Sequence, residues 1–163
     1  MIVVEDKLTT LFDNLPYLTV GGESFKPIFE FGDLKDLNKF LKQEVKKYPL
    51  IWLESGFNES FNEEGVSISP NIVIATYGLN LSYSNREKLD INFKTVLMPL
   101  LENVIKTFER SNIIIFNGSD CKITKYYNYG DESRHETTDI WDAIKLEVEI
   151  TIKDDCIKQV NYG

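Results

Sequence analysis

The sequence offers few side chains for metal binding or nucleophilic catalysis. It contains one histidine, His135, and two cysteines, Cys121 and Cys156. The cysteines lack CxxC spacing and have no cluster of histidines near them, so we expect no zinc site. We interpret them as reduced thiols, with a disulfide as the alternative. A Ser-His-Asp triad would have to use His135, and no serine at a sharp strand-to-helix turn presents itself as the nucleophile.

The loops that bind phosphates or activate a serine are also missing. Neither GxxxxGK[ST] nor GxGxxG occurs, and there is no GxSxG elbow. No run approaches the roughly 20 apolar residues that a membrane span needs, and the N-terminus lacks the features of a signal peptide. We therefore expect no enzyme activity, no cofactor and no membrane partner.

Basic residues are absent or scarce in two stretches. The chain has 18 basic and 26 acidic residues, a net charge of -8. Residues 48–85 hold four glutamates and no lysine or arginine, and residues 128–142 hold five acids and one arginine. Such segments suit solubility or a surface that repels polyanions. The candidate assembly or lumen residues are Glu54, Glu59, Glu63, Glu64, Asp131, Glu132, Glu136 and Asp139.

The second acidic stretch surrounds His135, and carboxylates with an imidazole can bind a divalent metal. Its spacing matches no metal motif, including the EF-hand. We favour a solvated acidic loop, with a partner contact and a metal site as alternatives. Aromatic residues at loop ends are frequent interface anchors, although burial in the core is the favoured role of Trp141. The candidate interface or strand-entry anchors are Tyr127, Tyr129, Trp141 and Asp142.

Apolar residues at helical spacing predict three helices. The first covers about Val4 to Leu15, the second runs from a cap at Asp33 to about Tyr48, and the longest spans Asp90 to Arg110. Pro99 lies inside the last pattern, so either the helix kinks there or its regular part begins near that residue.

Strands are predicted between and after these helices. Residues 25–31 are a weak candidate for an edge strand, and residues 49–55 and 71–83 are clearer candidates for strands. Residues 55–70 are a long loop or a hairpin. Residues 112–116 and 121–129 look like a hairpin, and residues 143–153 alternate most sharply.

This order predicts an α+β fold with two to three helices on a mostly antiparallel or mixed sheet. We expect one domain over residues 1–163, with a helical N-terminal part (1–47), an α+β core (48–153) and a flexible tail or assembly arm (154–163).

Several segments resemble a known family. "YPLIWLES", an acidic loop, "VLMPLLENVIKTFERS" and "YYNYGDESRHETTDIWDAIKLEVEITIK" are similar to segments of bacteriophage and prophage tail-terminator (tail-completion) proteins. The likeness covers roughly residues 48–153 and consists of patterns of shape, without catalytic signatures. It implies a subunit of a ring, usually a hexamer, that closes the head-proximal end of a long tail.

The resemblance also implies the partners: further copies of the chain, the major tail tube protein and the head-tail connector proteins. Genomic DNA would pass through the ring without specific binding. The expected location is the virion tail or neck, after assembly in the bacterial cytoplasm. The alternatives are a head-tail connector or stopper protein of the neck, and a small cytosolic metal-dependent enzyme or binding module.

Overall fold

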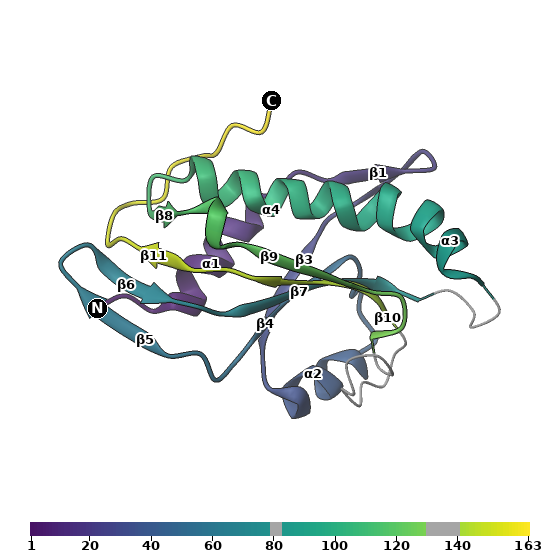
Figure 1. Cartoon of the computed structure of the whole chain (residues 1–163), viewed down its shortest axis with the longest axis horizontal. Helices are drawn as coiled ribbons and strands as arrows, with labels where there is room; N and C mark the ends of the chain where they lie inside the picture. The colour runs from purple at the N-terminus through teal and green to yellow at the C-terminus, as the bar shows by residue number, and fades with distance from the viewer. Residues whose placement is uncertain (79–82, 130–140) are drawn as a thin grey trace.

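The computed structural model describes residues 1–78, 83–129 and 141–163. It confirms the predicted α+β class, since helices pack on mixed and antiparallel sheets (Figure 1). The helices are α1 (Val4–Asp13), α2 (Leu34–Leu41), α3 (Asn85–Lys88), the π-helix η1 (Leu89–Leu97), α4 (Met98–Arg110) and the short 3₁₀ turn η2 (Gly118–Asp120). No helix in these described ranges is long and apolar enough to cross a membrane.

The strands of the described residues form three sheets. A small hairpin pairs β1 (Leu18–Val20) with β2 (Glu23–Phe25). A five-stranded sheet has the order β3-β4-β7-β10-β9, and a four-stranded sheet has the order β5-β6-β11-β8. Their strands are β3 (Ile28–Gly32), β4 (Leu50–Glu54), β5 (Glu59–Asn62), β6 (Gly65–Ile68), β7 (Asn71–Tyr77), β8 (Ile114–Phe116), β9 (Lys122–Tyr126), β10 (Trp141–Glu147) and β11 (Ile150–Ile152).

The two larger sheets share one continuous antiparallel strand pair, called the shared ribbon, in which β6 and β7 run beside β11 and β10. β6 leads into β7, and β10 leads into β11. Glu147 pairs with Asn71 and Ile150 pairs with Ile68, so one antiparallel register continues through the junction. A backbone bond from the Val148 N–H to the Pro70 carbonyl, at 3.5 Å, spans the break. The two sheets are therefore held together by a single long strand pair.

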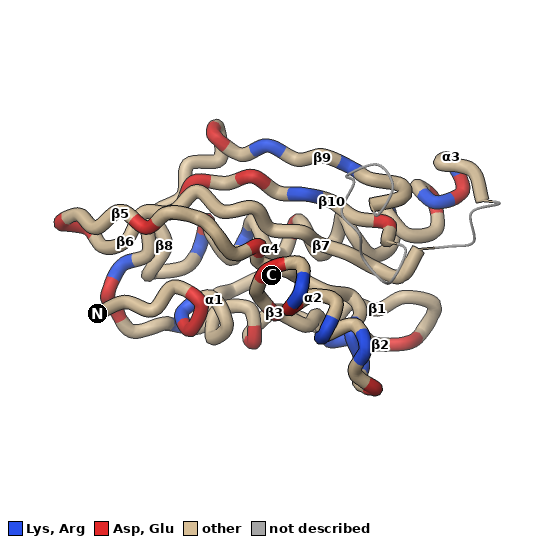
Figure 2. The backbone as a smooth tube through the Cα atoms, turned by 90° about the horizontal axis from the view of Figure 1, so that it is seen from below, with Lys and Arg blue, Asp and Glu red and all other residues tan. Residues whose placement is uncertain are grey.

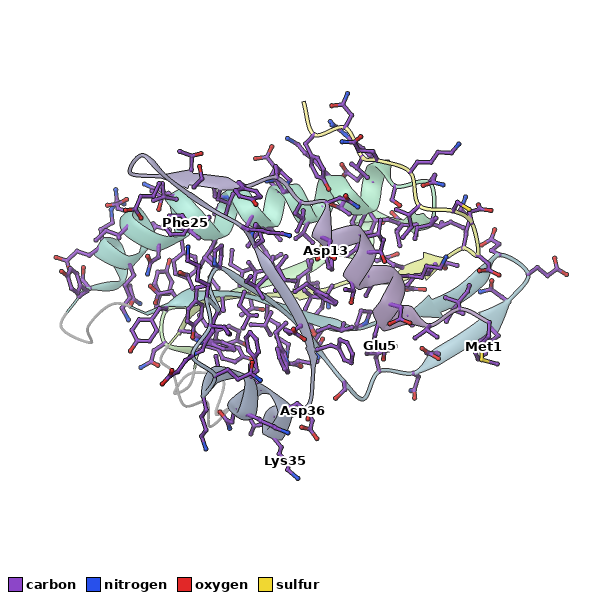
Figure 3. The ribbon with its side chains drawn as sticks, turned by 180° about the vertical axis from the view of Figure 1, so that it is seen from behind. Met1, Glu5, Asp13, Phe25, Lys35 and Asp36 are labelled. Atoms are coloured by element: carbon purple, nitrogen blue, oxygen red, sulfur yellow. The ribbon has the colours of Figure 1, made fainter. Side chains whose placement is uncertain are left out.

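Both faces of the five-stranded sheet are covered. α1 and α4 lie over one face, and α2 lies over the other (Figure 1). Figure 3 shows α1 from behind, with Glu5 and Asp13 marking its two ends and Lys35 pointing from α2 away from the sheet. Burial on both faces explains why "LIWL" in β4 is a continuous apolar run.

The long helix resolves the ambiguity at Pro99. It begins at Ser84, whose side chain accepts a bond from the Glu87 N–H in a capping box, and it passes through a π-helix before α4. The Met98 N–H donates to the Phe93 carbonyl, five residues earlier. Pro99 lies in the first turn of α4, directly after the π-helix, where its fixed φ suits a helix. Of the two alternatives that the sequence left open at Pro99, the structure shows the second: the regular α-helix begins at Met98, after the π-helix.

The predicted hairpin of residues 112–116 with 121–129 is wrong. β8 pairs with β11, whereas β9 pairs with β10, so the two segments lie in different sheets. The predicted single strand over residues 143–153 divides at residues 148 and 149. Its buried face was predicted correctly, since Ile144, Leu146, Val148, Ile150 and Ile152 are all buried.

The second helix is shorter than predicted. The Asp33 cap is confirmed, with a capping box to Asp36, but α2 ends at Leu41. Only Leu37 and Leu41 of this helix are buried. Val45, which lies inside the predicted helix, is 56% exposed, so it supplies no buried contact that would stabilise a longer helix.

The C-terminal segment lies along the chain itself. The hydroxyl groups of Thr107 and Tyr162 are 2.8 Å apart, and Arg110 donates to the Asn161 carbonyl at 2.5 Å. The Asn112 side chain accepts a bond from the Lys158 N–H. Val160 is buried. The end of α4 thus holds this segment, for which the sequence predicted a flexible tail or an assembly arm.

Residues 55–70 contain the β5–β6 hairpin, one of the two predicted possibilities. Its turn is closed by the Asn62 carboxamide, which accepts bonds from the N–H groups of Glu64 and Gly65 at 2.9 and 3.1 Å. Gly65 has a φ of +147°, and a Cβ there would lie 2.0 Å from the Ile152 carbonyl oxygen. The hairpin therefore approaches β11 at a point that only glycine allows.

Gly65→Ala is expected to lower the free energy of unfolding by about 2–4 kcal/mol, because it adds backbone strain and a clash with β11. Urea denaturation followed by circular dichroism measures the change. Gly118→Ala is the matched control, since the nearest atom to a Cβ there is 3.7 Å away. Equal stabilities of the two variants would show that β11 yields without cost.

Candidate functional site

The predicted anchors converge at the start of β10. Trp141 is the first residue of this strand, and Asp142 follows on its opposite face. Tyr129 stacks on Trp141 with ring centroids 5.4 Å apart, while Tyr127 packs on Phe93 at 4.6 Å. These anchors are therefore engaged within the chain, and their role in an interface stays a prediction.

On the α2 side of the sheet, aromatic side chains and one carboxylate are connected by hydrogen bonds. The indole N–H of Trp141 donates to the Tyr48 hydroxyl at 2.7 Å. Glu54 accepts from the Tyr129 hydroxyl at 3.0 Å and from the Asn71 side chain at 3.3 Å. Glu54, predicted as a lumen residue, thus has its carboxylate bound at the end of β4.

A pocket of about 200 Å³ lies beside this network. Its lining includes three aromatic residues, Trp52, Trp141 and Tyr129, and two acidic residues, Glu54 and Asp33. The Asp36 backbone N–H, which bonds the Asp33 carboxylate, lowers the pKa of that group and keeps it charged. Ligand pockets usually measure roughly 300–1,000 Å³, so this volume suits only a small group.

On the other face, an ion pair is buried beneath η1. Lys88 is 3% exposed and Asp142 is 0% exposed, and the Lys88 Nζ lies 3.8 Å from the Asp142 Oδ1. The Lys88 ammonium also donates to the Tyr127 carbonyl at 2.5 Å. Asn92 donates to the Asp142 Oδ2 at 2.7 Å. The cluster fixes the start of the long helix against the start of β10.

Lys88 and Asn92 were not among the sequence-predicted residues. They lie four positions apart and so share one face of the helix. The capping box at Ser84 and Glu87, which begins the helix one turn before Lys88, was the signal that could have located this face. Their partner Asp142 is distant in the chain, so its identity required the tertiary structure.

The predicted acidic residues divide into three groups. Glu59, Glu63 and Glu64 are exposed on the β5–β6 hairpin, and Glu54 is bonded internally. The remaining candidates and the histidine lie outside the described residues; they are Asp131, Glu132, His135, Glu136 and Asp139. Within residues 1–78, 83–129 and 141–163, no group of three His, Cys, Asp or Glu side chains could hold a metal ion.

No protein-family model, curated protein or solved structure matches the chain. The resemblance to tail terminators therefore remains a prediction based on the quoted segments.

Lys88→Met is expected to lower the free energy of unfolding by about 3–5 kcal/mol, because it leaves the Asp142 charge buried without its cation. Lys94→Met, which breaks the exposed ion pair with Asp90, is the control and should leave stability nearly unchanged. Denaturant titration of both variants gives the comparison.

Asp142→Asn added to Lys88→Met should restore most of the loss. The asparagine keeps an acceptor for Asn92 and removes the unpaired charge. A double variant as unstable as Lys88→Met alone would contradict this explanation.

Proposed function

We propose that the protein is a structural virion subunit that forms a ring at the head-proximal end of a long phage tail. In this role it caps the tail tube and joins it to the head connector. The observation that carries the proposal is the β5–β6 hairpin, whose β5 is exposed along its whole length and whose strands and turn carry Glu59, Glu63 and Glu64. The resemblance described above supplies the class of assembly.

The hairpin extends at one end of the molecule, and its acidic tip is visible in Figure 2. Residues 48–85 contain no lysine or arginine, so the hairpin has no basic residue of its own to neutralise this charge. A ring with such tips directed inward would present an acidic lumen. Duplex DNA is strongly negative, so it would pass along such a lumen without binding.

The head-tail connector or stopper role is the alternative within the same assembly. It uses the same ring and lumen but a different neighbour. Binding to the tail tube protein supports the terminator, whereas binding to the portal complex supports the connector.

Purified protein is expected to form closed rings, either alone at high concentration or when the tube protein is added. Light scattering coupled to gel filtration gives the mass, and negative-stain electron microscopy gives the symmetry. A chain that stays monomeric at every concentration and does not bind either the tube protein or the portal complex would refute both roles in the neck.

Reversing the charge of the hairpin tip should make the protein retain DNA. We expect Glu63→Lys with Glu64→Lys to shift a duplex in a gel at about 50 mM salt, where basic contacts are strong, while the wild type does not. Glu102→Lys with Glu109→Lys on α4 is the matched control for net charge. Equal DNA binding by the two double variants would contradict a lumen position for the tip.

A further inference from the structure

Among the described residues, the two larger sheets end at four edge strands: β3 and β9 in the five-stranded sheet, and β5 and β8 in the four-stranded sheet. β3 and β8 are partly buried, whereas β5 and β9 are the more exposed edges. Every residue of β5 is exposed, and so are the first four residues of β9. An exposed edge strand presents unpaired N–H and C=O groups that can bind another strand.

These two edges carry opposite charge. β9 contains Lys122 and Lys125 and no acid, whereas β5 and its turn contain Glu59, Glu63 and Glu64 and no base. Among the described residues, none of these five side chains forms an ion pair. Pairing of β5 with β5, or of β9 with β9, would bring like charges together, so charge favours β5 with β9.

The strand directions also suit this combination. β5 is antiparallel to β6, which continues in the direction of β7; β9 is antiparallel to β10, which is antiparallel to β7. β5 and β9 therefore run in opposite directions, on opposite sides of the shared ribbon. A second copy that presents the same sheet face would bring its β9 antiparallel to β5 of the first.

One register matches the side chains as well. Phe61 is 68% exposed and Ile123 is 44% exposed, and both lie on the sheet face that packs against α1 and α4, since they pair with Val66 and Leu146. In an antiparallel register with Phe61 opposite Ile123, Glu59 lies opposite Lys125 on the same face. An apolar pair and an ion pair would thus form side by side.

We propose that β5 of one copy pairs antiparallel with β9 of the next copy, with Phe61 against Ile123 and Glu59 against Lys125. The contact joins two different surfaces, so repeated contacts close into a ring or extend as a filament. This inference rests on the proposed ring and names its subunit contact. Glu59 then belongs to the contact, and Glu63 and Glu64 remain at the exposed tip.

Charge reversal tests the ion pair. Glu59→Lys or Lys125→Glu alone should weaken self-association about 3- to 30-fold, because a favourable cross-strand pair becomes a repulsive one. The double variant Glu59→Lys with Lys125→Glu should recover wild-type association, as measured by sedimentation velocity with and without tube protein. Glu109→Lys on α4 is the control for net charge and should have little effect.

Cysteine cross-linking tests the register. Phe61→Cys and Ile123→Cys are placed in separate chains, each with Cys121→Ser and Cys156→Ser. The Cα atoms of directly opposite residues in an antiparallel pair are about 4.5–5.5 Å apart, a distance that a disulfide can span. Mixed chains should therefore form a heterodimer on oxidation. Ile115→Cys on β8, which is similarly exposed, replaces Ile123→Cys in the control mixture and should react poorly.

The outcomes separate this contact from the proposed function. Suppose that the wild type forms rings but the double charge-reversal variant does not recover self-association, or the cross-linking yield is no higher than in the Ile115→Cys control. Either result would overturn the β5–β9 contact and leave the proposed ring standing. Rescue and cross-linking without closed rings or tube binding would support the contact and overturn the function. A chain that never self-associates, with tube protein or without it, would refute both.

Discussion

Strand β10 is buried on both of its faces along its first four residues, Trp141 to Ile144. On one face, Trp141 and Ala143 pack among the aromatic residues beneath α2. On the other face, Ile144 and Leu146 pack beneath α1 and α4. A central strand of this kind can bury only apolar side chains or polar side chains that have a partner. The helices packed on each face must therefore supply apolar contacts or the required polar partner.

Asp142 makes that requirement strict at one position. Its carboxylate is buried on the sheet face that α1 and α4 cover. There it contacts the ammonium group of Lys88, at the end of α3, and the side chain of Asn92, in η1. A buried ion pair contributes modest net stability but tolerates little misalignment, since loss of one partner leaves an isolated charge. The start of the long helix is therefore tied to β10 by charge, whereas α4 is held by apolar packing.

The sequence predicted those features that depend on neighbouring residues. The Asp33 cap and the alternating burial from Ile144 to Ile152 are both local patterns. At Pro99 the sequence left two alternatives open, and the structure decides between them. The pairing of β8 and β9 was not predicted correctly, because sequence proximity suggested a hairpin while both strands found distant partners in β11 and β10. The alternation of apolar and polar residues predicts that a segment is a strand, but it does not predict which other strand pairs with it.

The candidate site shows the same division. Burial of Trp141 was favoured from its place in an apolar segment, and the structure confirms it. The internal bonds of Glu54 were not predicted, because Asn71 and Tyr129 approach it from other strands and loops. Acid-rich composition cannot distinguish a carboxylate that faces solvent from one that accepts bonds within the fold.

The absence of basic residues from the hairpin and its flanking strands also determines where trypsin can cleave the chain. Trypsin cleaves after lysine and arginine, and the nearest such residues on either side of β4, β5, β6 and β7 are Lys47 and Arg86. These four strands are released as one peptide, however completely the protein unfolds. Nicks in the exposed hairpin would be detected with a protease that cleaves after glutamate.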